Sequence, residues 1–229
     1  NKSGAVTGVA LRPTGAAQSE APRVPIERES VVFRSADATL SGTLMLPQDG
    51  NATRPAIVLL HGSGPLTRNS FGPYPLFFAS LGFAVLTYDK RGTGDSTGVR
   101  VDASTGRAMA AEIYPTGILN DAAAAFAFLE QRRGIDRARI GFWGSSEGGM
   151  LATQAAARLP DAAFAIDSSG FMGPLWQTTL YQAGAYARRA GAAEADVRES
   201  VDFTQQWLDV ARTGAGWDAF VARRDEIRR

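Results

Sequence analysis

The stretch 139–149, RIGFWGSSEGG, decides the fold of this chain, because it leads from an apolar strand into a tight turn and then into a helix of small residues. Its centre, Gly144-Ser145-Ser146-Glu147-Gly148, has the Gly-x-Ser-x-Gly spacing of a nucleophile turn. Glycine flanks the serine there because a larger side chain would collide with neighbouring backbone. The pattern predicts Ser146 as the nucleophile, and the alternative is a plain tight turn that packs a helix on a sheet.

The same spacing occurs a second time, at residues 94–98, but its context differs. Ser96 follows its strand by several residues, lies in a Gly-rich loop and has no helical pattern after it. A nucleophile turn needs a strand that feeds directly into the turn and a helix that leaves it. We therefore predict that Ser96 is a structural loop residue.

One histidine, His61, is present in the whole sequence, in the segment 60–65 that follows an apolar strand. In folds with this turn the catalytic histidine comes after the serine in chain order. We therefore expect His61 to organise its loop through a hydrogen bond to backbone, with a direct catalytic role as the alternative. Glycine-rich backbone at a strand end can also present N–H groups to an oxyanion. The N–H groups of Ser63 and Glu147 are the predicted pair.

Short apolar runs alternate with helical patterns along the first 170 residues. This alternation predicts an α/β fold, with a mostly parallel sheet covered by helices on both faces. The predicted strands are residues 31–33, 39–46, 56–60, 83–88, 139–143 and 162–166, and the predicted helices are residues 74–81, 118–131 and 146–158.

The strand patterns stop after Gly170, and three helices are predicted, at residues 174–189, 194–212 and 217–228. The chain thus divides into an N-terminal strand and linker (1–29), a core (30–170) and a helical cap (171–229). The N-terminal strand is the short apolar piece at residues 6–11, which could be the end of a preceding β-rich domain. The cap carries five aromatic residues, and we expect most of them to pack in its own core, with the wall of a pocket for the acyl group as the alternative: Phe171, Trp176, Tyr181, Tyr186 and Trp207.

The charged loop 89–98 and the carboxylate of Asp167 each need a separate interpretation. The loop 89–98, DKRGTGDSTG, is Gly-rich, but it lacks the Gly-Lys-Ser/Thr ending and the following helix of a phosphate-binding loop. We predict a self-satisfied loop in which Arg91 pairs with a local carboxylate. Asp167 closes the last strand, and we predict a capping role for it, with the orientation of a histidine as the alternative.

Composition excludes several classes of function. The formal net charge is +1, so no strong field would attract nucleic acid or an anionic membrane. The absence of cysteine excludes disulfides and thiolate metal sites, and a single histidine excludes a histidine-rich metal site. No apolar stretch approaches the length of about 20 residues that a membrane-spanning helix needs.

Three motifs in this order, at residues 61–65, 88–96 and 144–149, resemble those of the α/β-hydrolase superfamily. The set is most similar to bacterial serine esterases with a helical cap, the group that merges into the prolyl-oligopeptidase-like and serine-aminopeptidase-like hydrolases. The resemblance extends from about Ile26 to the end, and it implies a triad that uses no metal or organic cofactor. It also implies a periplasmic or secreted setting, with a cytoplasmic one as the alternative.

The sequence departs from that pattern in one respect. The superfamily places its catalytic acid after a later strand and its histidine near the C-terminus, and neither is present here. The predicted sheet is also incomplete and would expose an apolar parallel edge. We therefore expect a C-terminal segment of the same protein, absent from these 229 residues, to complete the sheet and to supply the acid and the histidine.

Three functions are compatible with the sequence. The first is a carboxylesterase in which Ser146 attacks the acyl carbonyl of a small-molecule ester. The second is a serine peptidase of the same superfamily, although no site for a charged terminus is recognisable. The third, of another class, is a non-catalytic binding scaffold, which the missing histidine favours and the surviving nucleophile turn opposes.

Overall fold

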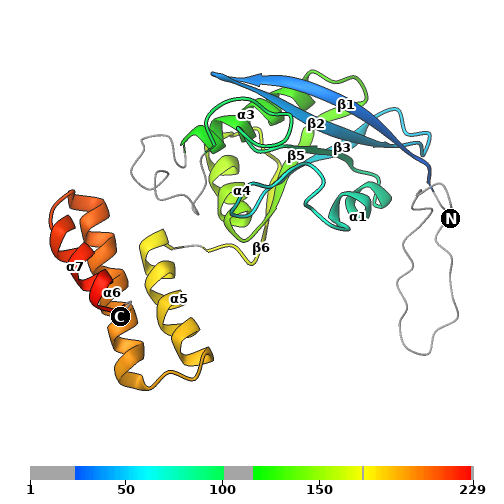
Figure 1. Ribbon diagram of the computed structural model, residues 1–229. Coiled ribbons are helices and arrows are strands. Elements are labelled where there is room, and N and C mark those ends of the chain that lie inside the picture. The colour runs from blue at the N-terminus through cyan, green and yellow to red at the C-terminus, as the bar shows by residue number, and fades with distance from the viewer. Residues whose placement is uncertain (1–23, 101–115, 172, 228–229) are drawn as a thin grey trace, which may run out of the picture. The chain divides into compact units, whose positions relative to one another are not determined.

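The computed structural model describes residues 24–100, 116–171 and 173–227. They separate into two compact units, one that ends at Gly170 and one that begins at Phe171 (Figure 1). Each unit is described by itself. The predicted short strand within residues 6–11 lies outside the described residues.

The first unit is built on a mixed sheet of six strands in the order β1-β2-β4-β3-β5-β6. β1 and β2 form an antiparallel hairpin, β2 is antiparallel to β4, and β3, β4, β5 and β6 pair in parallel. Each predicted strand corresponds to one of these, so the predicted fold class is confirmed. The strands are β1 (Ile26–Ser35), β2 (Ala38–Pro47), β3 (Arg54–Leu60), β4 (Ala84–Tyr88), β5 (Ile135–Ser145) and β6 (Phe164–Ser168).

The hairpin begins earlier than the sequence pattern indicated. β1 starts at Ile26, which pairs with Pro47 at the far end of β2, so the strand extends into the segment predicted as a linker up to residue 29. Glu27, Arg28 and Glu29 are three charged residues in a row, so the sequence showed no strand pattern at this end of β1. Cross-strand pairing with the apolar β2 extends the strand despite these charged side chains.

Helices cover both faces of the sheet (Figure 1). α3 (Thr116–Glu130) and α4 (Glu147–Arg158) pack on one face, and α1 (Tyr74–Ser80) packs on the other. Successive side chains of a β-strand point to opposite faces of the sheet, so the core divides into two clusters, one under each layer of helices. The larger cluster includes Val58, Phe142 and Leu151, whereas the α1 side includes Ile57 and Trp143.

The sheet remains open at β6, which pairs with β5 and with no other strand among the described residues. Ile166 on this edge strand is 41% exposed. The strands of a parallel sheet are ordinarily covered on both faces. The expected apolar edge is therefore present.

The second unit consists of three helices, α5 (Leu175–Arg189), α6 (Glu194–Thr213) and α7 (Trp217–Ile227). Gly184 of α5 lies against Val197 and Val201 of α6, where an added Cβ would come 3.2 Å from the Val201 side chain. Phe203 and Phe220 stack with ring centroids 5.0 Å apart and join α6 to α7. These contacts form a small core within the unit.

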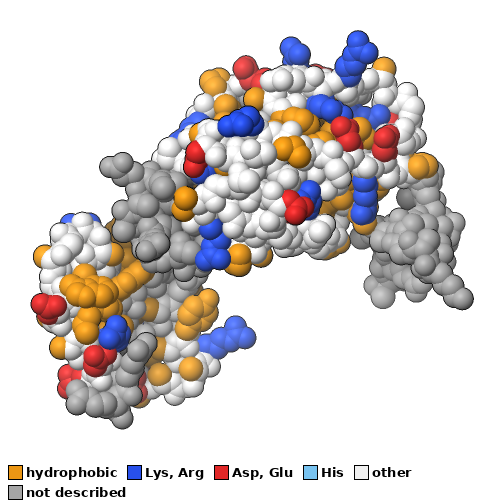
Figure 2. Space-filling view, turned by 45° about the horizontal axis from the view of Figure 1, so that its top comes forward, with side chains coloured by type: hydrophobic (Ala, Val, Ile, Leu, Met, Phe, Trp, Pro, Cys, Tyr) orange, Lys and Arg blue, Asp and Glu red, His pale blue; other side chains and the backbone are white. Residues whose placement is uncertain are grey.

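Three of the five aromatic residues proposed for the core of this unit do not lie in it. Trp176, Tyr181 and Tyr186 are exposed, and Figure 2 shows hydrophobic side chains on the surface of the helical unit. The prediction that most of the five pack in the core is wrong. α5 places its small residues, Gly184 above all, against α6, so its large aromatic side chains point elsewhere. None of the helices in the described ranges has the length and apolar character needed to cross a membrane.

Candidate active site

Ser146 lies between the end of β5 and the first residue of α4, as the strand–turn–helix pattern predicted. Its backbone has φ 57° and ψ −125°, a conformation that L-residues rarely adopt. The N–H of Ser146 donates to the carbonyl oxygen of Ser168 in β6, 3.0 Å away. Strain of this kind costs roughly 1–3 kcal/mol and is typical of functional sites.

The glycines around Ser146 are required by close backbone contacts. A Cβ on Gly144 would lie 2.0 Å from the carbonyl oxygen of Gly148, and one on Gly148 would lie 2.2 Å from that of Leu60. No real Cβ contact is so short, so any side chain at either position would force the turn apart. The Gly-x-Ser-x-Gly spacing thus follows from the packing of α4 on β5 and β3.

The loop after β3 lies directly against this turn. A Cβ on Gly62 would be 3.2 Å from the carbonyl oxygen of Ser145 and 3.7 Å from Cβ of Ser146. The structure therefore brings the segment that carries Ser63 next to Ser146. Glu147 is the first residue of α4, at the helix end whose dipole favours negative charge.

Lys90 connects these two segments. Its Nζ donates to the carbonyl oxygen of Gly62 at 2.8 Å and to Oε2 of Glu147 at 3.1 Å. Both side chains of the ion pair are buried. The sequence pattern placed Lys90 only in a Gly-rich loop and did not predict this contact, because residues 90 and 147 are far apart in the chain.

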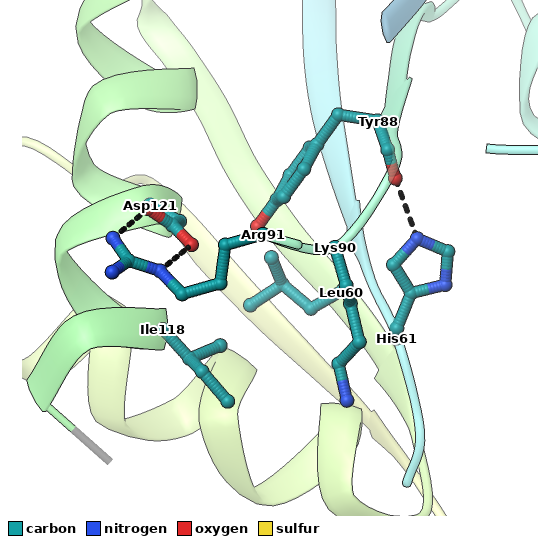
Figure 3. A pocket seen from close by; sticks show the side chains of 7 residues that line it. All are labelled: Leu60, His61, Tyr88, Lys90, Arg91, Ile118 and Asp121. Atoms are coloured by element: carbon teal, nitrogen blue, oxygen red, sulfur yellow. Dashed lines mark hydrogen bonds and ion pairs between the residues drawn. The ribbon is translucent and has the colours of Figure 1, made fainter. Parts of the chain in front are cut away.

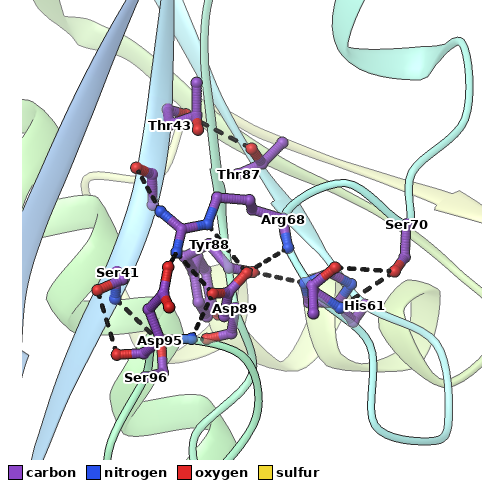
Figure 4. A network of polar contacts seen from close by, with 12 residues as sticks. Ser41, Thr43, His61, Arg68, Ser70, Thr87, Tyr88, Asp89, Asp95 and Ser96 are labelled. Atoms are coloured by element: carbon purple, nitrogen blue, oxygen red, sulfur yellow. Dashed lines mark hydrogen bonds and ion pairs between the residues drawn. The ribbon is translucent and has the colours of Figure 1, made fainter.

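His61 is buried just after the end of β3, where it contacts the backbone of Tyr88 and the ring of Phe71. Its Nε2 lies 2.6 Å from the carbonyl oxygen of Tyr88 (Figures 3 and 4). Its ring stacks on that of Phe71 at a centroid distance of 4.1 Å. Burial lowers the pKa of His61 to about 4. The imidazole is thus neutral at pH 7 and bonded to backbone, which agrees with the expected role in organising its loop.

The loop after β4 is closed by an arginine outside that loop, Arg68, which no sequence pattern predicted. Arg68 binds both carboxylate oxygens of Asp89, at 3.1 and 2.7 Å, and also pairs with Asp95 (Figure 4). Burial raises the pKa of Asp89, but hydrogen bonds from Arg68 outweigh this and keep that pKa below its ordinary value. The hydroxyl of Ser96 donates to the carbonyl oxygen of Asp89 and accepts from the N–H of Ser41, as a structural residue would.

Arg91 has different partners from those predicted. It forms a two-pronged pair with Asp121 of α3, with distances of 2.8 and 2.7 Å (Figure 3). It also contacts Asp37 of the hairpin turn. Neither carboxylate is local to the loop, so the prediction of a local partner is wrong. The guanidinium instead ties the loop to α3, since both charges are buried and each needs a full partner.

Asp167 lies at the end of β6, where its Oδ1 accepts a hydrogen bond from the N–H of Gly170 at 2.5 Å. A Cβ on Gly149 would come 2.0 Å from the same oxygen. The carboxylate therefore fills the space beside the first turn of α4. This is the turn-closing role predicted for it. Within residues 24–100, 116–171 and 173–227, no cluster of potential ligands could hold a metal ion.

Comparison with known proteins identifies the family. The family profile of X-Pro dipeptidyl-peptidases (S15) matches residues 12–225. The chain belongs to the S15 family. This membership and the observed fold confirm the predicted α/β-hydrolase superfamily.

Two curated relatives are similar to this chain over part of their own length. An uncharacterised 31.7 kDa protein of Escherichia coli is 34% identical over 116 residues, which are 51% of this chain and 37% of that protein. The quorum-quenching protein AidA of Acinetobacter baumannii is 32% identical over 143 residues, which are 62% of this chain and 43% of AidA. The chain thus spans roughly two-fifths of these curated relatives.

A solved structure shares the fold. The acetyl xylan esterase of Paenibacillus sp. R4 superposes with a TM-score of 0.59 at 22% identity, covering 81% of this chain and 65% of the esterase. At this identity the likeness concerns the fold alone.

Proposed function

We propose that this chain carries the nucleophile and oxyanion site of a serine hydrolase that cleaves carboxylic acyl esters. Oγ of Ser146 attacks the carbonyl carbon, and the ester C–O bond breaks with release of the alcohol. Water then hydrolyses the acyl-enzyme and releases the acid. No metal or organic cofactor takes part in these steps.

The observation that carries this proposal is the backbone of Ser146. A non-glycine residue at φ 57° between a buried strand and a helix is strained, and a plain turn would relieve that strain with glycine. A serine retained there presents its hydroxyl at the tip of a sharp turn. This is the geometry a nucleophile requires.

The proximity of the loop after β3 supports the assignment of the oxyanion donors. Gly62 lies against Ser146, so the N–H groups of Ser63 and Glu147 would flank the oxygen of a bound acyl group. The positive end of the α4 dipole would add to the stabilisation of the negative charge.

The base must come from elsewhere, because His61 is the single histidine in the sequence and is buried against Tyr88. We assign the base and its acid to a C-terminal segment of the same protein outside residues 1–229. Two observations support such a segment. The β6 edge exposes Ile166, and the curated relatives are more than twice as long as the matched region. The segment would add strands beside β6.

A fluorophosphonate probe tests the proposal on the full-length protein. We expect it to label Ser146, with hydrolysis of p-nitrophenyl acyl esters that is lost in Ser146→Ala. A full-length protein that is folded, unlabelled and inactive on esters and amides would instead indicate a non-catalytic scaffold. Ser96→Ala serves as a matched control in the other Gly-x-Ser-x-Gly segment and is expected to leave labelling intact.

Family membership favours a second candidate, a serine peptidase. Both reactions use the same nucleophile and oxyanion site, so the site geometry does not separate them. A comparison of kcat/KM on p-nitrophenyl esters with that on X-Pro p-nitroanilides does. We expect the ester to be the better substrate, and a preference for the amide would favour the peptidase.

That the helical unit from residue 171 is a cap domain stays a prediction. Trp176, Tyr181 and Tyr186 are exposed on this unit. The periplasmic or secreted location stays a prediction, which cell fractionation would test against a cytoplasmic one.

A further inference from the structure

We infer that Lys90 is a positioning residue that fixes both halves of the oxyanion site at once. The inference rests on the proposed function, since it gives a purpose to Lys90 only if Ser63 and Glu147 hold the oxyanion. Lys90 itself would not touch the substrate. It would act through the backbone of Gly62-Ser63 and through the first residue of α4.

The ammonium group of Lys90 is enclosed by its partners. Its side chain is 4% exposed and that of Glu147 is 3% exposed, and the Nζ–Oε2 distance is 3.1 Å. A second hydrogen bond, 2.8 Å long, runs from Nζ to the carbonyl oxygen of Gly62. One cation therefore bridges two segments that are separated by more than 80 residues of sequence.

The bond to Gly62 sets the direction of the Ser63 N–H. In a trans peptide the C=O and N–H of the same unit point in opposite directions. Because Lys90 holds the carbonyl of Gly62 on one side, the N–H of Ser63 must point to the other side. A carbonyl without this tether could rotate with the Gly-rich loop and carry the donor away from the site.

The contact with Glu147 holds the second donor. Glu147 is the first residue of α4, so a tether on its side chain restrains the end of the helix where its N–H lies. Removal of one preorganised oxyanion donor costs about 100- to 1,000-fold in kcat in serine hydrolases. If the N–H groups of Ser63 and Glu147 both lose their alignment, the rate of acyl transfer should therefore fall.

Stability alone does not account for this pair. A buried ion pair is often no more stabilising than apolar side chains of similar volume. The adjacent residue provides a comparison, because Arg91 forms a second buried pair, with Asp121, that contacts α3. Arg91→Met is thus a matched control for the loss of a buried pair in the same loop.

The test uses full-length protein and three variants, Lys90→Met, the double variant Lys90→Met/Glu147→Met, and Arg91→Met. The double variant removes both charges of the buried pair, so it is expected to fold even where the single variant does not. Measured quantities are kcat and KM on a p-nitrophenyl ester, and affinity for a boronic acid that forms a tetrahedral adduct with Ser146. Circular dichroism and thermal melts establish that each variant is folded.

We expect folded Lys90 variants to lose about 100-fold in kcat, with KM changed less than about 3-fold, and to bind the boronic acid about 100-fold more weakly. Arg91→Met should lose stability, whereas its folded fraction keeps kcat. Folded Lys90→Met/Glu147→Met with wild-type kcat and boronate affinity would overturn the inference. Failure of the proposed function looks different, because wild-type protein would then lack fluorophosphonate labelling and ester hydrolysis.

Discussion

Nε2 of His61 lies 2.6 Å from the carbonyl oxygen of Tyr88, at the point where β3 and β4 leave the sheet side by side. This bond fixes the start of the loop that carries Ser63 to the end of a neighbouring strand. Nδ1 of the same ring is buried and has no hydrogen-bond partner among the residues that the structure describes. A proton at that nitrogen would place an unpaired charge in the core.

His61 should therefore make folding stability depend on pH. Burial lowers the pKa of His61 to about 4, against 6.5 in the unfolded chain. Between these values the unfolded state binds the additional proton, so stability falls as pH falls through this window. We expect the free energy of unfolding to drop by about 2 kcal/mol from pH 7 to pH 5. Urea denaturation at the two pH values measures it.

His61→Gln provides the control for this pH effect. Glutamine can place its amide near the position of Nε2 and donate to Tyr88, but it does not titrate. The variant should lose most of the stability difference between pH 7 and pH 5. An unchanged pH dependence would mean that another group causes it.

Ser146→Gly should stabilise the protein while it abolishes labelling by a fluorophosphonate. Glycine adopts φ 57° without the steric cost that a Cβ incurs, although it gains entropy in the unfolded state. The net gain should be about 1 kcal/mol in chemical denaturation. Ser146→Ala removes the hydroxyl and keeps the Cβ, so it should lose labelling without that gain. Equal stability of the two variants would contradict strain at this residue.

Gly148→Ala should strongly destabilise the first unit. The new Cβ would lie 2.2 Å from the carbonyl oxygen of Leu60, so α4 would have to move off the sheet. We expect a loss of about 3 kcal/mol, or insoluble protein. Gly50→Ala is the control, because Gly50 has φ 80° but nothing within 4 Å, and should cost only about 1 kcal/mol. Similar losses for both would refute the close packing at Gly148.

Arg68→Met should show how much the buried contact between Arg68 and Asp89 contributes to the free energy of unfolding. The Asp89 side chain is 2% exposed, so the variant leaves a buried carboxylate without its guanidinium partner. We expect a loss of about 3 kcal/mol in unfolding free energy. Asp95 contacts the same guanidinium but is 81% exposed, and Asp95→Asn should cost less than about 1 kcal/mol. The prediction fails if the two variants are equally stable.

The local features of this fold could be predicted because they depend on near neighbours in the chain. The apolar run 56–60 and the strand before Ser146 needed only their own side-chain pattern to be recognised as buried strands. The start of β1 was missed because Glu27 and Arg28 form a strand only through pairing with β2. The exposure of Tyr181 was missed because helical spacing does not tell which face meets a partner.

The sequence by itself determined the order of strands and helices along the chain, the nucleophile turn at Ser146 and the superfamily. Strand patterns, turns and the requirement for glycine each depend on a few neighbouring residues. Tertiary structure alone decided which charges meet: Lys90 with Glu147, Arg91 with Asp121 and Arg68 with Asp89. The two residues of each pair are 21 to 57 positions apart in the sequence. Folding brings such partners together, and burial then requires that each charge be paired.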